Sequence, residues 1–335
     1  MIKQKKYIML TKDPLHIGDG GLTLGKIDNP ITKDPCTHVP KVPGSGVAGP
    51  NKYYTDLKLV NLEQKDSKFD IGRRKHNTAK DTSITWCAST EGKCGDDCLM
   101  CYTFGYSTDS INSKGVLAYY DANILFFPVY SSMLGQVWIT SQNIYNSYFD
   151  DPTTINLHEG KVKASACYPD TEKIEIGGLI FEIENVPLQP SFISKFFIKL
   201  GFQGEEKKVY IVPDSYFSFL VQKNLEQRTC VAIDPNTGAA KPGALYSFEA
   251  IPANTILQFQ VNMNEYKKHK SPFKKNEETI KRLKEEFKKQ NPDTDIDERS
   301  FTPLDLIEFG FKGMEQFGFG GMNTRGFGRA KIIQI

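Results

Sequence analysis

Asp28 and the segment Gly44-Ser45-Gly46 are the first residues in this sequence whose types and spacing could do chemistry. Asp28 lies between Ile27 and Asn29-Pro30, and proline biases the backbone before it toward extended geometry. An extended backbone can hold a carboxylate out from a wall, where it could act on a proton or on a metal-bound water. The glycine segment would expose backbone N–H groups, which can hold a phosphate. The simpler alternatives are a turn-capping aspartate and an ordinary glycine turn.

A cluster of four cysteines is the most specific motif that the residues alone provide. Six, three and two residues separate its successive members, Cys87, Cys94, Cys98 and Cys101. The last two have the spacing of a zinc knuckle, and a site of four thiolates without an open position would be structural. Zn²⁺ would then stabilise an insert that is too polar to form its own core. The alternatives are a chance cluster of buried thiols or a redox pair at Cys98 and Cys101.

A long connection must position Asp28 and the glycine segment. Residues 3–10 predict a first strand, and residues 14–49 then contain seven glycines and five prolines. This composition indicates an ordered loop, with Ile31 and Val42 among the residues that pin it to a core. The polar residues 51–85 show little periodicity, and we interpret them as a surface lid that orders on binding. A solvated loop tip is the alternative.

The rest of the chain is typical of a strand-rich fold with a few helices. We expect strands near residues 116–129, 137–140, 209–212, 255–263 and 325–335, helices at 214–225, 277–289 and 301–317, and hairpins at 161–185 and 227–251. Because the strands and helices do not alternate as βαβ units, the pattern predicts the α+β class. No repeat or linker divides the sequence, so we expect a single domain over residues 1–335.

The composition is that of an ordinary globular protein, with 39% apolar and 24% charged residues. The net charge is only +2, so binding to a polyanion would rest on local basic surface. No apolar run approaches the length of a membrane span, and we expect a cytoplasmic protein with no membrane partner. In such a chain seven cysteines favour metal binding or thiols over disulfides.

Motifs near both ends resemble those of a known family. His16, Gly18 and Gly20 precede the motif segments 25–31 and 39–45, and a glycine-rich segment follows at 319–329. Segments at 116–122, 127–129, 137–140, 209–212 and 243–246 keep the same family's order between them. On these residues the chain resembles the RAMP superfamily, and more narrowly the repeating backbone subunit of type III CRISPR effector complexes. The cysteine insert is similar to the zinc-bearing versions of type III-D and III-E systems.

The resemblance implies a ferredoxin-like, RNA-recognition-type antiparallel sheet with long insertions. Residues 51–110 would form a lid and the zinc knuckle. Residues 161–185 would form the thumb, a projecting β-hairpin that wedges into the guide RNA and displaces one base at a regular interval. The alternative for residues 161–185 is a plain hairpin of the core sheet.

The resemblance also implies partners and chemistry. The expected partners are a guide RNA (crRNA), a complementary target RNA and other CRISPR effector subunits, including neighbouring backbone subunits. The aspartate matching Asp28 would cut the target with Mg²⁺ or Mn²⁺, and attack by the ribose 2′-OH would leave a 2′,3′-cyclic phosphate and a 5′-OH. The residues expected to contact RNA are His16, Lys41, Gly44, Ser45, Gly46, Lys52, Gly320, Gly321, Arg325 and Arg329.

Two other functions stay open on the sequence. One is the same subunit with an inert loop, and the other is a guide-processing endoribonuclease, which would need a histidine-centred site. Among the five histidines only His16 and His38 lie near Asp28 in the sequence. The family usually continues its Gly-Ser motif into a helix with a guide-contacting lysine. Here Gly49-Pro50 is expected to break such a helix, and Lys52 would have to substitute for that lysine.

Overall fold

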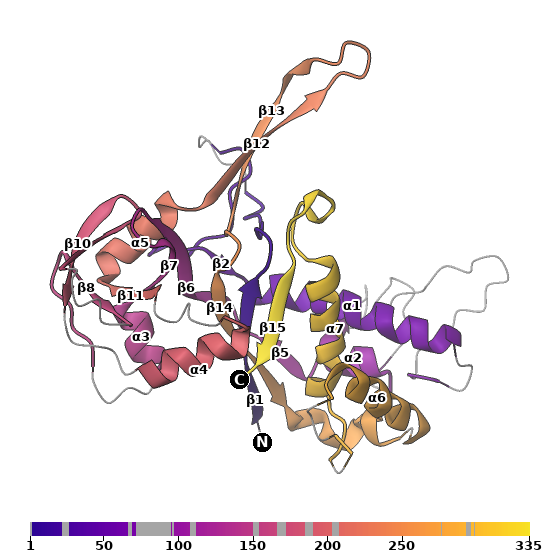
Figure 1. The fold of residues 1–335 in the computed structure, drawn as a ribbon. Coiled ribbons are helices and arrows are strands. Elements are labelled where there is room, and N and C mark those ends of the chain that lie inside the picture. The colour runs from indigo at the N-terminus through magenta and orange to yellow at the C-terminus, as the bar shows by residue number, and fades with distance from the viewer. Residues whose placement is uncertain are drawn as a thin grey trace.

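The computed structural model (Figure 1) describes residues 2–21, 27–65, 69–71, 95, 97–107, 112–149, 154–165, 172–184, 190–202, 208–275, 277–292, 296–297 and 299–335. In these residues an eleven-stranded sheet forms the body, along the path β15–β1–β14–β6–β7–β11–β8–β10–β9 with β2 and β5 beside it. Two-stranded sheets β12–β13 and β3–β4 lie outside this body. The predicted α+β class is confirmed.

The first half of the sheet brings the two ends of the chain together. Its neighbouring strands are antiparallel: β15 (Ala330–Gln334), β1 (Ile2–Thr11), β14 (Ile256–Asn264) and β6 (Ala122–Ser131). β2 (Lys41–Val42) pairs with β6, and β5 (Leu117–Tyr119) pairs with β14. Both faces of β1 are buried, since Tyr7 and Met9 belong to one apolar cluster and Ile8 and Leu10 to another. Other elements must therefore pack on both faces of β1 to shield its apolar side chains from water.

Helices α1 (Gly44–Lys65) and α7 (Pro303–Phe317) cover one face of this half (Figure 1). The ring of Phe311 on α7 packs edge-on against Tyr7 of β1, with the ring centroids 4.9 Å apart. The helices approach each other closely because Gly310 leaves room for Asn51 of α1, whose side-chain amide donates to the Ile307 carbonyl at 2.8 Å. This packing ties the segment after β2 to the carboxyl-terminal part of the chain.

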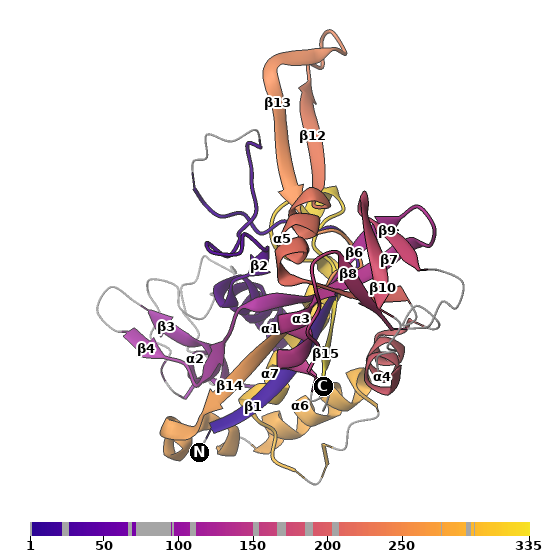
Figure 2. The same cartoon turned by 90° about the vertical axis from the view of Figure 1, so that its left-hand side faces the viewer.

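The second half of the sheet carries its own helices. Its strands are β7 (Gly135–Ser141), β11 (Val209–Val212), β8 (Lys161–Ala164), β10 (Leu179–Glu184) and β9 (Lys173–Ile176), with parallel pairs at β7–β11 and β8–β10. Helices α3 (Gln142–Tyr148), α4 (Pro190–Leu200) and α5 (Asp214–Lys223) pack around them (Figure 2). Trp138 and Phe197 meet at 5.3 Å in an aromatic cluster that also includes Phe126.

The hairpin of β12 (Glu226–Ile233) and β13 (Ala240–Ala250) stands away from the body in both views (Figures 1 and 2). It is the hairpin that the turn near residues 236–238 predicted. We expected the projecting hairpin at residues 161–185 instead, but β8, β9 and β10 belong to the large sheet. The alternation of side chains in that segment is the signature of any half-buried strand, so the core-sheet alternative describes it better.

Helix α1 corrects two predictions, because residues 44–49 were expected in a loop and residues 51–85 in a lid. The helix runs from Gly44 to Lys65 and contains Pro50. Gly49 has no Cβ to clash with the proline ring, so the pair is compatible with helical geometry. Burial of Val47 and Leu59 in the main apolar cluster then outweighs the weak local propensity. Residues 66–68 and 72–85 of the expected lid lie outside the described residues, as do residues 86–94, 96 and 108–110 of the predicted lid and zinc-knuckle insertion.

Smaller elements complete the periphery. They are α2 (Leu99–Phe104), β3 (Gly105–Ser107), β4 (Asn112–Lys114), the 3-10 segments Glu265–Lys270, Pro272–Lys274 and Asn323–Arg325, and α6 (Glu277–Gln290). No helix in the described part of the chain is long and apolar enough to cross a membrane.

Candidate functional site

Three stretches that are far apart in the sequence meet where the hairpin joins the body. They are residues 13–21 with 27–33, the glycine-rich residues 319–329, and four consecutive residues of β13. The last four, Tyr246, Ser247, Phe248 and Glu249, we call the hairpin base. Side chains alternate between the two sides of a strand. Accordingly, Tyr246 and Phe248 contact residues of the glycine-rich stretch, whereas Ser247 and Glu249 contact residues 28–33.

The exposed carboxylate of Asp28 is bound to Ser247. The Ser247 N–H donates to Asp28 Oδ2 at 2.7 Å and its hydroxyl donates to the same oxygen at 3.0 Å. The Asp28 N–H in turn lies 3.2 Å from Ser247 Oγ. The next residue continues the pairing, because the Asn29 N–H donates to the Ser247 carbonyl and its own carbonyl accepts from the Glu249 N–H. The segment around Asp28 is thus a short extra strand on β13.

These contacts also set the charge of the site. The backbone N–H and the hydroxyl of Ser247 hold the pKa of Asp28 below its usual range, because both donate to the ionised form. Asp28 is therefore an anion at neutral pH. No other described residue donates a hydrogen bond to its Oδ1 atom, and no described cation forms an ion pair with it. One oxygen of the exposed Asp28 carboxylate is thus held by Ser247.

The glycine-rich stretch lies directly against residues 12–16. The Gly321 N–H donates to the His16 carbonyl at 2.8 Å, and the Gly328 N–H donates to the Pro14 carbonyl at 2.9 Å. Gly320 has a φ of +81°, and a Cβ there would overlap the His16 carbonyl. Glycine is needed at this position because both the conformation and the close approach exclude a side chain. Arg329 closes the contact through two bonds to Asp13, at 2.6 and 3.0 Å.

Aromatic and cationic side chains cover the other side of the hairpin base. Phe327 of the glycine-rich stretch packs on Phe248, with centroids 5.3 Å apart, and the guanidinium of Arg228 lies 4.6 Å over the Phe327 ring. Arg325 donates to the Tyr246 hydroxyl. It is exposed and forms no ion pair with a carboxylate among the described residues. Its positive charge is therefore open to an anionic ligand beside the hairpin.

His16 was expected to contact RNA, but its side chain is buried and bonds to the hairpin base inside the protein. Its Nδ1 atom lies 2.7 Å from the Glu249 carbonyl. A carbonyl can only accept, so Nδ1 carries the proton in this contact. Glu249 itself is paired with Lys33, at 2.9 Å, and is nearly buried. The structure thus gathers His16, Asp28, Gly320, Gly321 and Arg325 around the hairpin base, and Arg329 lies beside them on Asp13. No feature of the sequence singled out Ser247 as their neighbour.

Lys41 and Gly44 have a different partner, Asp121, which the sequence did not single out. The Gly44 N–H donates to Asp121 Oδ1 at 2.9 Å, and Lys41 Nζ lies 2.9 Å from Asp121 Oδ2. A carboxylate is thus bound where a phosphate was expected, at the amino-terminal end of α1. Ser45 is exposed and Gly46 packs on Val42. Lys52 reaches the Gly105 carbonyl at 3.4 Å instead of the hairpin base.

The cysteine cluster is described only in part, since Cys87 and Cys94 lie outside the described residues. Cys98 precedes α2 and Cys101 lies in its first turn, and both are almost completely buried. Among the described residues no group of three or more histidine, cysteine, aspartate or glutamate side chains is arranged to hold a metal ion.

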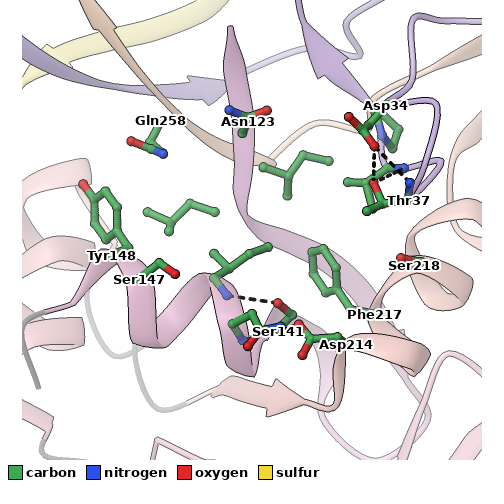
Figure 3. Close-up of a pocket in the computed structure, with 16 residues that line it drawn as sticks. Asp34, Thr37, Asn123, Ser141, Ser147, Tyr148, Asp214, Phe217, Ser218 and Gln258 are labelled. Atoms are coloured by element: carbon green, nitrogen blue, oxygen red, sulfur yellow. Dashed lines mark hydrogen bonds between the residues drawn. The ribbon is translucent and has the colours of Figure 1, made fainter. Parts of the chain in front are cut away.

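A pocket of about 530 Å³ lies between residues 34–40, strand β6 and helices α3 and α5 (Figure 3). Its polar groups serve local structure. Asp34 accepts the N–H groups of Cys36 and Thr37, and Ser141 caps α3 by accepting the Ile144 N–H at 3.1 Å. None of the hairpin-base residues lines it.

Comparisons with known proteins agree with the predicted resemblance. Residues 9–331 match the family model of the RAMP superfamily. The chain is 25% identical over 272 residues to the CRISPR system Cmr endoribonuclease Cmr4 of Pyrococcus furiosus, covering 76% of this chain and 80% of that protein. It is 30% identical over 118 residues to the CRISPR system Cms endoribonuclease Csm3 of Methanothermobacter thermautotrophicus, covering 33% and 38%.

Solved structures share the fold at lower identity. A chain of the type III-B Cmr-beta complex bound to cognate target RNA has a TM-score of 0.61 and 13% identity, with 99% of this chain and 97% of that chain covered. A crystal structure of Cmr4 has a TM-score of 0.55 and 18% identity, with 99% of both chains covered. Because the family model spans nearly the whole sequence, this protein belongs to the RAMP superfamily.

Proposed function

We propose that this chain is a guide-RNA-binding backbone subunit of a type III CRISPR effector complex and that it cuts the complementary target RNA with Asp28. Two curated relatives are named endoribonucleases of such CRISPR systems. The observation that carries the proposal is the position of Asp28, whose exposed carboxylate is fixed at the base of a projecting hairpin. A strand of RNA lying across that base would meet an anion, an exposed arginine and the hairpin together.

The hairpin β12–β13 takes the role of the thumb in this proposal. Its outer part is exposed and carries apolar side chains, including the facing pair Val231 and Leu245 and, beyond them, Ile233. Such side chains can enter a base stack. Arg325 would bind phosphate, and the other partners would be the guide RNA and the neighbouring subunits. Sequence selection would rest on base pairing between guide and target.

The lowered pKa of Asp28 favours one chemical role over another. In the proposed reaction the ribose 2′-hydroxyl gives its proton to water and its oxygen attacks the adjacent phosphorus. The bond from phosphorus to the 5′-oxygen breaks and that oxygen takes up a proton, which yields a 2′,3′-cyclic phosphate and a 5′-OH. An efficient general base has a pKa near the working pH, and hydrogen bonds from Ser247 hold that of Asp28 low. Asp28 is therefore better suited to orient the 2′-hydroxyl by accepting its hydrogen bond.

A divalent cation also fits this donor set. Mg²⁺ is often held by one or two carboxylates together with substrate phosphates and water, and Mn²⁺ accepts the same oxygen ligands. Asp28 Oδ1 would be the protein ligand in that case, and the ion would neutralise charge on the phosphate.

Substitution of Asp28 by asparagine tests the proposal. The complete effector complex, loaded with guide RNA, is mixed with labelled target, and both binding and cutting are measured. Asp28→Asn should abolish cutting at this subunit's sites while guide and target binding survive. Asp34→Asn is the matched control, because Asp34 is a partly exposed carboxylate of the same connection that is held by its own turn.

Unchanged cleavage by the Asp28→Asn complex would refute the assignment. If the wild-type complex bound target without cutting it, the inert-subunit alternative would hold instead.

We also propose that the first half of the sheet is a ferredoxin-like core. The supporting observation is its order, β15–β1–β14–β6, in which every neighbour is antiparallel. Helix α1 follows β1 and α7 follows β14, and both lie on one face. This is the arrangement of a β-α-β-β-α-β unit with the strands in the order fourth, first, third, second. The second half of the sheet and the hairpin would then be insertions.

Structural Zn²⁺ at Cys87, Cys94, Cys98 and Cys101 remains a separate proposal. The donor chemistry fits, since thiolates are the preferred ligands of closed zinc sites. The two described members are buried at the start of a six-residue helix. So short a helix is not stable on its own, and a metal ion would account for its place in the fold.

A further inference from the structure

Ser247 makes three hydrogen bonds with Asp28, which is more than a strand residue needs for pairing. We propose that Ser247 is a positioning residue for the cutting reaction and that its hydroxyl orients the Asp28 carboxylate toward the target ribose. This inference rests on the proposed function and deepens it. It assigns to the hairpin a part in the chemistry as well as in separating the RNA strands.

The geometry of the contact explains how a hydroxyl could matter. An exposed aspartate samples several rotamers, and its terminal torsion is broad. Two donors on a single oxygen, the Ser247 N–H at 2.7 Å and its hydroxyl at 3.0 Å, restrict both torsions. The second carboxylate oxygen is then held in one direction. A fixed acceptor can keep the ribose 2′-hydroxyl in line with the phosphorus that it attacks. Without the hydroxyl, one donor would remain and the carboxylate could turn about that bond.

Hydrogen bonds and an ion pair hold Ser247 and the segment around Asp28 in one position relative to each other. The Asn29 N–H donates to the Ser247 carbonyl at 3.0 Å, and the Glu249 N–H donates to the Asn29 carbonyl at 3.1 Å. Lys33 is tied to Glu249 by an ion pair of 2.9 Å. Asp28 and the hairpin base must therefore move together. The carboxylate keeps its place relative to the hairpin, so the cut would fall at a constant distance from the point where the hairpin enters the RNA.

The chain offers a matched control on the neighbouring strand. Thr229 of β12 lies directly opposite Ser247 in the hairpin register. It is exposed and forms no hydrogen bond with Asp28. Thr229→Ala removes a hydroxyl and a methyl group from the hairpin without touching the carboxylate, so it is a slightly larger change than Ser247→Ala.

The experiment compares Ser247→Ala, Ser247→Thr, Thr229→Ala and Asp28→Asn in the complete guide-loaded complex. Single-turnover cutting is followed at saturating target, and target affinity is measured separately. Ser247→Ala should cut about tenfold more slowly, the effect of losing one hydrogen bond that acts in the reacting state. Ser247→Thr should cut at the wild-type rate, because threonine keeps both the backbone N–H and the hydroxyl as donors. Thr229→Ala should cut like the wild type, and affinity should stay within about twofold in all four.

The outcomes separate this inference from the proposed function. If Asp28→Asn cuts normally, the proposed function fails. If Asp28→Asn is inert but Ser247→Ala cuts at the wild-type rate, only the positioning role fails. That role is also overturned if Ser247→Thr is as slow as Ser247→Ala, or if the loss in Ser247→Ala follows weaker target binding, since either result would indicate a structural effect.

Discussion

At the scale of single residues, Gly44 shows how one atom decides the start of a helix. Its N–H donates to Asp121, and a Cβ at this position would overlap the carbonyl oxygen of Tyr119. The motif that suggested a phosphate cradle is therefore explained, within the free chain, by close packing against β5 and its following turn. At Gly46, two residues later, a Cβ would lie 3.5 Å from a methyl group of Val42 and 3.6 Å from one of Ile17, which are ordinary contact distances.

This difference makes a prediction for two identical substitutions. Gly44→Ala should lower the free energy of unfolding by about 1–3 kcal/mol, because a backbone oxygen cannot move aside cheaply. Gly46→Ala should leave stability unchanged or raise it by up to about 1 kcal/mol, since alanine favours the helix. Urea unfolding of both variants measures the effect. Equal loss in both would mean that the glycines serve the helix in some way other than packing.

At the scale of elements, α2 is a helix whose order cannot come from local helix propensity alone. It spans only Leu99–Phe104, yet Leu99, Met100 and Tyr102 are buried in the main apolar cluster. The Leu99 N–H donates to the Ile71 carbonyl at 3.0 Å. Packing accounts for part of this order, and the proposed zinc site would hold the segment that leads into it.

The zinc proposal predicts about one Zn²⁺ per purified chain. Cys98→Ser should lose the metal and lower the melting temperature, and a strong chelator should destabilise the wild type in the same way. Cys36→Ser is the control, because Cys36 is exposed and far from the cluster in sequence. Mass spectrometry under native conditions counts the metal. A wild-type chain without zinc that melts at the same temperature with chelator would contradict the proposal.

At the scale of the whole molecule, the fold brings the segment that follows β1 and the segment that precedes β15 under the hairpin. β1 pairs with β15, and residues 12–16 bond to the glycine-rich stretch that precedes β15. The hairpin base contacts both, through Asp28 on one side and Arg325 and Phe327 on the other. The body is thus complete without the outer hairpin, whose residues 231–245 are largely exposed.

Shortening the hairpin tests that division. Replacement of residues 232–244 by Asn-Gly joins the paired residues Val231 and Leu245 with a two-residue turn. The melting temperature should change by only a few degrees, because the removed part buries little surface. Target cutting should fall sharply while guide binding remains, since Asp28 and Ser247 are intact but the strands are no longer separated. Normal cutting by this variant would exclude a role for the hairpin tip.

Local patterns in the sequence predicted several elements correctly. The spacing of apolar residues predicted α5, α6 and α7, and the turn near residues 236–238 predicted the β12–β13 hairpin. Motifs near the ends indicated the superfamily and singled out Asp28. These features depend on neighbours a few residues apart, and such neighbours are read directly from a sequence.

Only the tertiary structure decided where those elements lie. Gly49-Pro50 continues helix α1, which packs on α7. Strands β8, β9 and β10 join the large sheet although their sequences alternate like a free hairpin. Ser247 became part of the site because residues 219 positions apart meet on one strand. Packing between distant segments outweighs local propensity, and no pattern within a short window reports which distant segment that will be.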